Sequence, residues 1–365
     1  MTGDVASDLV LRPADRCDDA ELRRLNAEVF PTNPKTRADI TAWQWWDNPF
    51  GETIAHVWEA EGRIVGQYVA YRIPATFDGQ PGRIAIGVDL AIAPSHRGQG
   101  LAGPLIDACF GQATEEGTPF YSYPNQLSVG GVARGGWVQV DQLEVRVLPT
   151  SAAALADQIA GLQAVQGAGT LGRLASKVAG MAGTVPVAAL GARVRVPAGT
   201  TVELLAEPPD DVDALWSAVA RHHPWGVARS ADWWRWRYAE HPDRPYRFVA
   251  ARRSGTLVGL AAVVTRDDLG GRFHCLLELL ALDGPAARAV VAAVRDTDLG
   301  DADGIATTCV PGSRLAQLAG QAGLSRVPPR LLSRPIYFGV VPHPTIVPDP
   351  TAVPWSTAWG DLDHI

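Results

Sequence analysis

The chain has 365 residues, 47% of them hydrophobic, and this length predicts two domains of ordinary size, each with its own core. Its formal net charge is −7 and no basic block occurs, which argues against nucleic acid as a partner. The four cysteines lie far apart without histidines at metal-ligand spacing, so we expect reduced thiols, a cytoplasmic location and no bound metal. The N-terminus has no cationic stretch, and the apolar run 178–191 contains Pro186, so we expect no secretory signal and no membrane span.

The first half of the sequence alternates short strands with amphipathic helices. The helix over 19–30 places Leu22, Leu25 and Val29 on one face, and a tight Glu61–Gly62 turn joins the two strands of a β-hairpin. In chain order the predicted elements are a strand over 8–13, helices over 19–30 and 36–46, a hairpin over 54–73, a long strand over 82–94, a helix from 101, and strands over 119–124 and 142–149. The helix from 101 is expected to bury one apolar face, made of Leu101, Leu105, Ile106, Cys109 and Phe110. This mixture predicts an α/β fold with a mixed sheet.

The second half repeats part of the first. The stretch ADITAWQWWDNP over 38–49 recurs as SADWWRWRYAEHP over 230–242, and EGRIVG recurs as SGTLVG. Both longer stretches hold a Trp-x-Trp pair, which we expect to pack in a core or between domains, although one tryptophan of each pair could line a cleft. Such a repeat predicts a duplicated domain. The predicted organisation is a first domain over 1–150, an Ala- and Gly-rich helical linker over 151–198, and a second domain over 199–365.

The stretch PSHRGQGLAG over 94–103, between the long strand and the next helix, fits two phosphate-binding patterns. Gly98 to Gly103 form G-x-G-x-x-G, which is typical of dinucleotide sites. Arg97 to Ala102 form R-x-x-G-x-A, which is typical of an acyl-CoA pyrophosphate loop. Both patterns place phosphate oxygens on backbone N–H groups at the N-terminus of a helix.

The surroundings of the loop favour the second pattern. A dinucleotide fold needs its first glycine directly after a strand and an acidic residue about twenty residues later, at the end of the next strand. Here Pro94 to Arg97 separate the strand from the glycine, Glu115 and Glu116 lie at the end of the helix, and the strand over 119–124 ends without an acid. The preceding strands form a hairpin, whereas a dinucleotide fold needs parallel strands. These observations argue against a dinucleotide fold. A Rossmann oxidoreductase that binds NAD(P) is kept only as a third hypothesis.

From about residue 8 to 148 the sequence resembles the GNAT superfamily of acyl-CoA-dependent N-acyltransferases. The order of elements around R-x-x-G-x-A fits the family, and in PNQLSVGGVARGGW the family's Asn and Gly-aromatic pair are similar to Asn125 and Gly136–Trp137. The W-x-W…NPFG pattern before the hairpin is similar to a branch often associated with sugar and natural-product acylation. The resemblance implies two GNAT-like domains in tandem. The second has DGPAARAVVAAV in place of the loop motif, so we expect it to be degenerate and not to bind CoA.

The resemblance also implies acetyl-CoA or another acyl-CoA as co-substrate. Glycines at 98 and 100 let the backbone approach phosphate, at a helix end where the dipole favours an anion. The long strand is expected to pair with the pantetheine amides, to carry a bulge and to splay from the strand over 119–124. The predicted CoA-binding residues are Leu90, Ala91, Ile92, Arg97, Gly98, Gln99, Gly100, Leu101, Ala102 and Asn125.

Acyl transfer to an amine requires a neutral amine, a donor for the tetrahedral oxyanion and a proton for the leaving thiolate. By resemblance, the oxyanion donor is a backbone N–H of the long strand at about Leu90 to Ile92. Many family members protonate the thiolate with a tyrosine four residues before the glycine of the Gly-aromatic pair, and that position is Val132 here. Tyr123 or Tyr121 is the candidate substitute, and an ordinary strand aromatic is the alternative for each.

Three residues are candidates for the general base. Asp89 interrupts the apolar strand IGVDLAIAP, where a carboxylate is costly unless it is paired or functional, so a catalytic base and a structural salt bridge are both open. His222 and His223 lie in ARHHPWG, a loop of the second half that could face the cleft, and histidine titrates in the useful range. An ordinary solvated loop is the alternative for this pair.

The main functional hypothesis is an N-acyltransferase that acts on the amine of a small molecule, such as an amino sugar or a natural product. The alternatives are a non-catalytic acyl-CoA-binding module, which the missing tyrosine favours, and an acetyltransferase for protein amines. The sequence leaves the acceptor, the acyl length and the oligomeric state open. The segment PWSTAWGDLDHI has two possible interpretations: it docks on the protein for structural reasons, or it takes part in acceptor binding.

Overall fold

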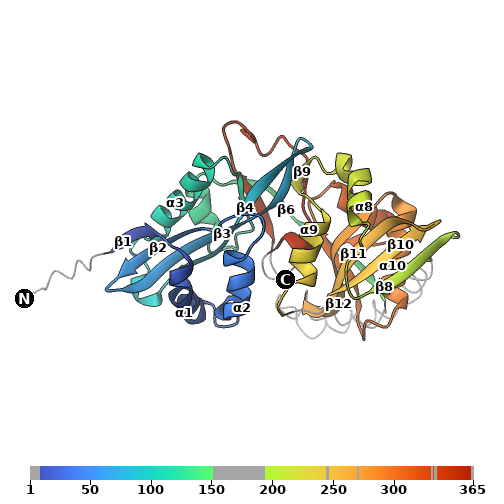
Figure 1. The fold of residues 1–365 in the computed structure, drawn as a ribbon, viewed down its shortest axis with the longest axis horizontal. Helices are drawn as coiled ribbons and strands as arrows, with labels where there is room; N and C mark the ends of the chain where they lie inside the picture. The colour runs from blue at the N-terminus through green and yellow to red at the C-terminus, as the bar shows by residue number, and fades with distance from the viewer. Residues whose placement is uncertain are drawn as a thin grey trace, which may run out of the picture.

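The structure is a computed structural model that describes residues 9–150, 194–243, 246–268, 271–329, 332 and 335–362. Two mixed sheets lie side by side, with helices packed on their faces (Figure 1). Among the described residues, nine strands form the first sheet and seven form the second. The predicted mixed α/β fold with two domains is therefore confirmed.

The first sheet is built around the long hairpin of β3 and β4. Its strands follow the order β1-β2-β3-β4-β5-β15-β6, with β9 paired to β3 and β16 paired to β9. The strands are β1 (Val10–Pro13), β2 (Ile54–Ala60), β3 (Arg63–Phe77), β4 (Gln80–Ile92), β5 (Phe120–Ser122), β6 (Val138–Gln142), β9 (Trp225–Val227), β15 (Tyr337–Val341) and β16 (Trp355–Ser356). Strands β2 and β3 are antiparallel, as the predicted hairpin requires, β3 and β4 are also antiparallel, and β4 and β5 are parallel.

Helices cover both faces of this sheet. Helix α1 (Asp19–Val29) covers one face, against which its apolar residues Leu22 and Leu25 are buried, and the short α2 (Ala38–Thr41) packs next to α1. Helix α3 (Ala102–Glu115) buries the opposite face with the apolar positions that the sequence predicts, and α4 (Val129–Arg134) lies next to it. The loop between β4 and α3 therefore lies at the edge of a well-packed core.

The second sheet repeats this order of elements. Its strands follow the order β14-β7-β13-β12-β11-β10-β8, and its helices are α8 to α11. Their bounds are β7 (Glu144–Pro149), β8 (Thr200–Leu205), β10 (Arg247–Arg253), β11 (Thr256–Asp268), β12 (Gly271–Ala281), β13 (Gly304–Cys309), β14 (Ser325–Arg326), α8 (Val212–Val219), α9 (Ala231–Trp234), α10 (Gly284–Asp296) and α11 (Arg314–Gln321). Strands β12 and β13 are parallel, like β4 and β5, so the duplication that the sequence repeat predicts is present in the topology.

The repeated tryptophans join the two domains. One turn of π-helix follows α2 over Ala42–Trp46, and another follows α9 over Arg235–Ala239. Trp43 and Trp236, the second residue of each turn, stack at 4.9 Å between ring centroids. Each indole Nε1 donates to the other residue's backbone oxygen, at 3.0 and 3.4 Å. This reciprocal contact is the pattern of a two-fold interface, so the predicted inter-domain packing is confirmed for this pair.

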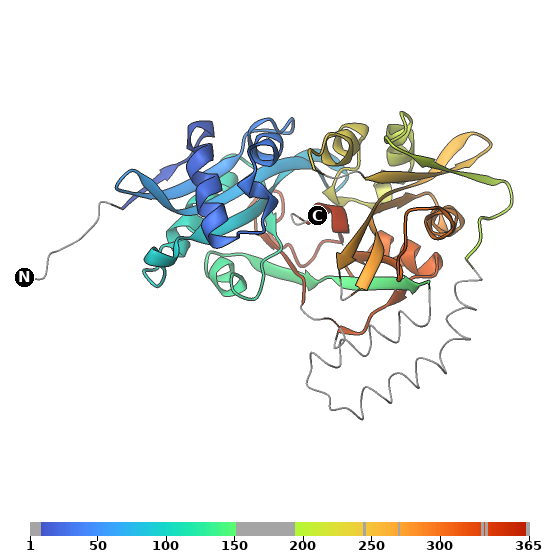
Figure 2. The same ribbon diagram turned by 90° about the horizontal axis from the view of Figure 1, so that it is seen from below.

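The two sheets exchange strands. Strand β7, which follows the first domain in sequence, pairs with β13 and β14 of the second sheet, whereas β15 of the second half lies between β5 and β6 of the first (Figure 2). The predicted domain boundary at residue 150 therefore does not divide the sheets, because β7 lies before it and β15 lies far after it. The predicted linker, 151–198, falls outside the described residues over 151–193.

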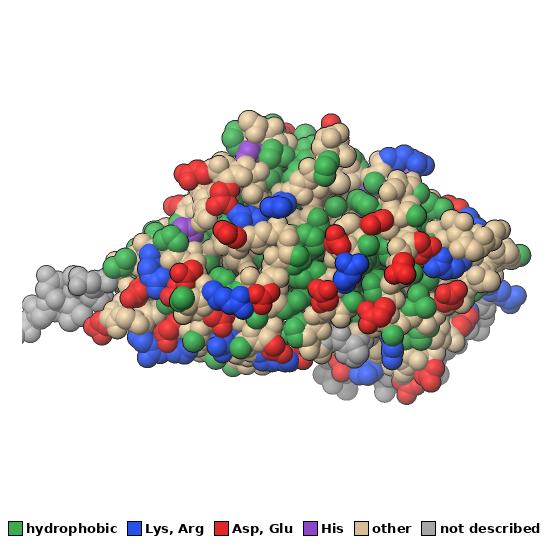
Figure 3. Space-filling model, viewed as in Figure 1, with side chains coloured by type: hydrophobic (Ala, Val, Ile, Leu, Met, Phe, Trp, Pro, Cys, Tyr) green, Lys and Arg blue, Asp and Glu red, His purple; other side chains and the backbone are tan. Residues whose placement is uncertain are grey.

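The face in Figure 3 carries acidic and basic side chains interspersed over both domains. Surface ion pairs occur among the described residues, such as Arg16 with Asp47 at 2.6 Å. None of the helices in the described ranges is long and apolar enough to cross a membrane.

Candidate active site

A bulge distorts β4 near its end. Val88 pairs with Val69 and Ala91 pairs with Gln67, so the β4 segment has one residue more than the β3 segment opposite it. Asp89 lies in this bulge with a φ of 52°, in the left-handed region that Asp tolerates better than most side chains. The bulge that the family resemblance implies is therefore present.

The bulge turns backbone donors toward an unpaired edge. Ala85 N–H bonds to the oxygen of Pro119 before β5, whereas Ala93 N–H bonds to the oxygen of Val65 on β3. Because N–H groups alternate between the two edges of a strand, the groups of Leu90 and Ile92 point away from β3. Strand β4 pairs with β5 only from Ala85 to Gly87, and beyond this point no described strand covers that edge. The expected slot between the two strands thus contains free backbone donors.

The loop after β4 is exposed and its amides are free. Gly98 and Gly100 have φ values of 78° and 75°, a conformation that strains other residues, and nothing lies within 4 Å of a Cβ built at either. Helix α3 begins without a side-chain cap, and the described residues offer no partner to the backbone N–H groups of 98–103. Unsatisfied N–H groups and the helix dipole are the features that favour an anion, and the binding of a pyrophosphate by this loop stays a prediction.

Neighbouring side chains hold the loop in place. Arg97 is exposed, and its Nε donates to the backbone oxygen of Ile92 at 3.2 Å, so its guanidinium lies beside the end of β4. The indole of Trp58 donates to the oxygen of Leu101 at 2.8 Å and anchors the start of α3. Asn125 lies before α4, where its Oδ1 accepts the N–H groups of Leu127 and Ser128 at 2.9 and 3.1 Å. Its role in CoA binding stays a prediction.

Asp89 forms the salt bridge that the sequence left open as the alternative to a catalytic base. Lys35 Nζ lies 2.7 Å from Oδ2 of Asp89, and the exposed fractions of the two side chains are 4% and 2%. Asn33 donates its Nδ2 to Oδ1 at 2.8 Å. Both partners come from the connection between α1 and α2. The carboxylate is therefore held by an ion pair and a hydrogen bond inside the bulge.

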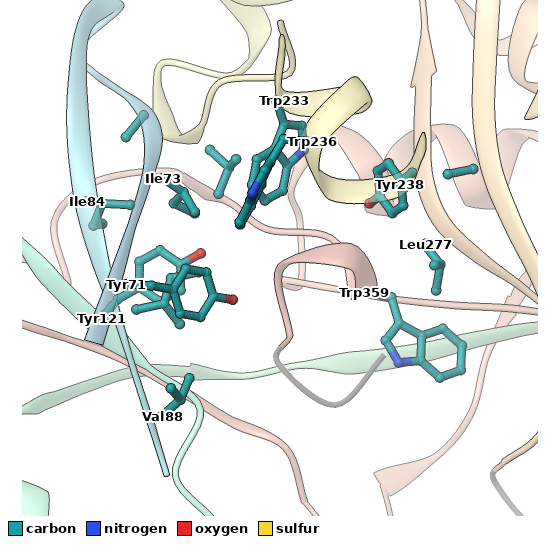
Figure 4. Close-up of a cluster of buried hydrophobic side chains, with 14 of the residues drawn as sticks. Tyr71, Ile73, Ile84, Val88, Tyr121, Trp233, Trp236, Tyr238, Leu277 and Trp359 are labelled. Atoms are coloured by element: carbon teal, nitrogen blue, oxygen red, sulfur yellow. The ribbon is translucent and has the colours of Figure 1, made fainter. Parts of the chain in front are cut away.

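Tyr121 and Tyr123 extend from β5 on the face that carries Tyr71. Figure 4 shows Tyr71 and Tyr121 together, with hydroxyls directed toward the side that carries Tyr238 and Trp359. The rings of Tyr121 and Tyr123 lie 5.5 Å apart. Burial raises the pKa of both phenols, and the neighbouring Tyr123 raises that of Tyr121 further, so both stay protonated at neutral pH. Each phenol therefore carries the proton that a donor needs, and the role of Tyr123 as that donor stays a prediction.

The two candidate histidines differ in environment. His222 is exposed, and its pKa is lowered by burial and by the neighbouring charge of Arg221. His223 is buried, with Nδ1 2.7 Å from Oγ of Ser356, and burial lowers its pKa to about 3. At neutral pH this imidazole is uncharged and holds the C-terminal segment. Their loop lies against the turn between β3 and β4, where Thr76 donates its hydroxyl to the backbone oxygen of His223 at 2.9 Å, so the structure does not place the histidines at the bulge.

A buried charged cluster escaped the sequence reasoning. Arg229 donates to Glu278 at 2.8 Å and to Asp361 at 2.7 Å, and the hydroxyl of Tyr238 donates to Glu278 at 3.1 Å. Burial raises the pKa of both carboxyl groups, while Arg229 opposes the shift. The pKa of Tyr123 is raised mainly by burial and then by the negative charge of Asp361. The cluster therefore faces the tyrosines of the first domain. Glu278 interrupts an apolar strand as Asp89 does, and this signal could have identified it.

Comparison with known families agrees with this geometry. Residues 11–137 match the family described as acetyltransferase (GNAT) domain, which identifies this part of the chain as a GNAT domain. The match contains β4, its bulge, the glycine loop and α3. None of the curated proteins matches the chain significantly.

Solved structures share the fold over both domains. A GCN5-related N-acetyltransferase from Anabaena variabilis is similar with a TM-score of 0.62 and 13% identity, over 91% of this chain and 72% of that chain. A probable N-acyltransferase from Enterococcus faecalis has a TM-score of 0.59 and 14% identity, over 92% and 72%. A GCN5-related N-acetyltransferase from Kribbella flavida has a TM-score of 0.57 and 14% identity, over 93% and 72%. At these identities the likeness shows the fold alone.

Proposed function

We propose that this protein transfers an acyl group from acyl-CoA, with acetyl-CoA as the simplest donor, to the amine of a small molecule. One observation carries the proposal: an open slot between β4 and β5 leads directly to a glycine loop whose amides have no partner among the residues that the structure describes. A pyrophosphate on that loop and an extended thioester arm along the free edge of β4 would satisfy both sets of donors.

The residues around the slot have separate roles in this proposal. The amine nitrogen attacks the thioester carbon, and the N–H groups of Leu90 and Ile92 bind the oxyanion that forms. When the carbon–sulfur bond breaks, Tyr123 gives its proton to the thiolate, and the proton of the amine leaves to a base. Asp89 is the candidate for that base at the bulge, and it could serve only when its pair with Lys35 opens.

The second domain supports a small acceptor. It packs against the face of the first sheet that carries Tyr71 and Tyr121, and Trp236 lies 6.1 Å from Tyr71 between ring centroids. A slot whose inner face is covered in this way suits a compact amine better than a folded protein.

The experiment is a thiol-release assay with acetyl-CoA, propionyl-CoA and octanoyl-CoA against amino sugars, aliphatic amines and lysine-containing peptides. We expect release with at least one class of small amine, and calorimetry should give one CoA per chain. CoA binding without release by any amine would favour a binding module, and release by peptides alone would favour a protein acetyltransferase. The absence of CoA binding would overturn the proposal.

A further inference from the structure

The second domain contains an opening that corresponds to the slot of the first. Strands β12 and β13 pair in parallel only over 273–275 and 304–306, and then separate. Ala262 pairs with Glu278 and Val263 with Leu276, so β12 carries a one-residue bulge just beyond the paired part. A parallel pair that separates at a bulge is the arrangement of β4 and β5 in the first domain.

The C-terminal segment Trp355–Leu362 lies in this opening. Ala358 forms an antiparallel bridge with Cys309, at the end of β13. The other edge of Cys309 is already paired with Glu144 of β7, so Ala358 lies on the edge that faces β12. The short 3-10 helix η8 (Trp359–Asp361) that follows contacts both β12 and β13. The chain therefore places its own backbone where the two strands separate.

Specific side chains hold the segment there. Arg237 donates Nε to the oxygen of Gly360 at 3.0 Å, and Arg229 pairs with the carboxylate of Asp361 at 2.7 Å. A Cβ built at Gly360 would overlap the hydroxyl of Tyr238 and lie 3.1 Å from Glu278. The site thus accepts a glycine followed by an acidic residue, at positions where a larger or a neutral side chain would fit poorly.

The other end of the segment is fixed to the first sheet. Trp355 and Ser356 form β16, which pairs in parallel with Trp225 and Gly226 of β9. His223 contacts Ser356 with its Nδ1, at 2.7 Å from Oγ. Trp355 is 2% exposed. The segment therefore spans from the first sheet to the opening of the second, with its anchoring groups buried at both ends.

We propose that the opening between β12 and β13 is a peptide-binding site, and that its ligand is the chain's own segment Trp355–Leu362. The site recognises an extended backbone with a buried aromatic residue, a glycine and then an aspartate. The contacts alone support the peptide site, and only its correspondence with the acyl-donor slot rests on the proposed function. In that correspondence, the segment takes the place that the thioester arm takes in the first domain.

The experiment cuts the tail and measures whether it stays. A protease recognition sequence is inserted between Thr351 and Ala352, which are both exposed, and the purified full chain is cleaved there. We expect the fragment that begins at Ala352 to co-elute with the protein after cleavage. A fluorescent synthetic peptide of the same sequence should then exchange into the site at one per chain.

Variants are placed in the peptide, so the folding of the protein is unchanged. Gly360→Ala should weaken binding by about tenfold or more through overpacking, and Asp361→Asn by a similar factor because it leaves Arg229 with less countercharge. Ala352→Gly, outside the segment, is the matched control and should bind like the natural peptide. Equal binding of all four peptides, or loss of the cut fragment from a protein that stays folded, would overturn the peptide site. Peptide exchange requires no acyl-CoA, so a failure of acyl transfer with exchange intact would count against the proposed function alone.

Discussion

Helices α3 and α10 follow corresponding strands of the two domains. They differ in which groups bind the backbone N–H groups of their first turns. The first turn of α3 has no cap and follows a glycine loop with free amides. At α10, Asp283 accepts the N–H of Ala286 at 2.8 Å and pairs with Arg253 at 2.7 Å. A carboxylate of the protein therefore provides at α10 the negative charge that a phosphate would provide at α3.

The openings beside these helices differ in the same way. The edge of β4 beyond Gly87 has no described strand against it, whereas the opening between β12 and β13 holds the C-terminal segment. At the N-terminus of α10 and in the opening between β12 and β13, groups of the chain itself occupy positions that a ligand could use. A duplicated fold can thus lose a ligand site and keep its shape, because the same backbone donors acquire internal partners.

The largest effect is expected at the buried ion pair of the first bulge. Asp89→Asn preserves shape and tolerates the positive φ, but removes the negative charge that pairs with the buried Lys35, so the free energy of unfolding should fall by about 3–5 kcal/mol. Adding Lys35→Gln should recover most of this loss. Urea unfolding measures both variants, and Asp47→Asn, whose pair with Arg16 is exposed, should change stability by less than about 1 kcal/mol.

The double variant Lys35→Gln/Asp89→Asn also tests the base. A fall of about 10²–10⁴ in the acyl-transfer rate, with stability restored and acyl-CoA affinity unchanged, would assign Asp89 as the base. A near-normal rate with an unchanged pH profile would exclude Asp89 as the base. Its remaining role would then be to hold the bulge in place. His222→Ala, measured in parallel, tests the remaining candidate.

Next in size is the glycine loop. Gly100→Glu places a negative side chain where the pyrophosphate would bind, and acyl-CoA affinity should fall by about 100-fold, the loss of one or two charge-assisted hydrogen bonds. Gly79→Glu is the matched control, because Gly79 also has a φ of 75° and open space around it but lies in the turn between β3 and β4. Calorimetry with CoA that shows equal affinity for the two variants would contradict the loop assignment.

A smaller, pH-dependent effect should separate the adjacent histidines. The pKa of His223 is about 3 in the folded protein, below the ordinary value of 6.5, so the unfolded chain binds more protons between these values. Stability from this group is present above about pH 6.5 and is lost as the pH falls, by about 1.4 kcal/mol per pH unit. His223→Gln should remove this acid sensitivity and His222→Gln should retain it, as urea unfolding at pH 7.5, 6 and 5 would show.

The smallest effect is expected at the cap of α10. Asp283→Ala removes the cap and the pair with Arg253, and should lower the free energy of unfolding by about 1 kcal/mol. Acyl-CoA affinity and the stoichiometry of one per chain should not change, because the loop motif is absent there. If this variant bound a second equivalent of CoA, the cap alone would account for the absence of CoA binding by the second domain.

The sequence predicted those parts of the site that depend on neighbours in the chain. The glycine loop, the start of α3 and an acid in the apolar strand β4 are local patterns, and periodicity identified the buried face of α3. The exchange of β7 and β15 was missed because a strand's pattern does not say which sheet it joins. The cluster of Arg229, Glu278 and Asp361 was missed because its members are far apart in the chain, although the acid in CLLELL gave the same local signal as Asp89.

The strand exchange has a consequence for synthesis of the chain. Strand β15 lies between β5 and β6, so the first sheet lacks an inner strand until Val341 has left the ribosome, long after β5 and β6. Its closure also waits for a contact of high sequence separation, whose entropic cost slows folding. The N-terminal domain, although first in sequence, should therefore be the last to become resistant to protease during translation.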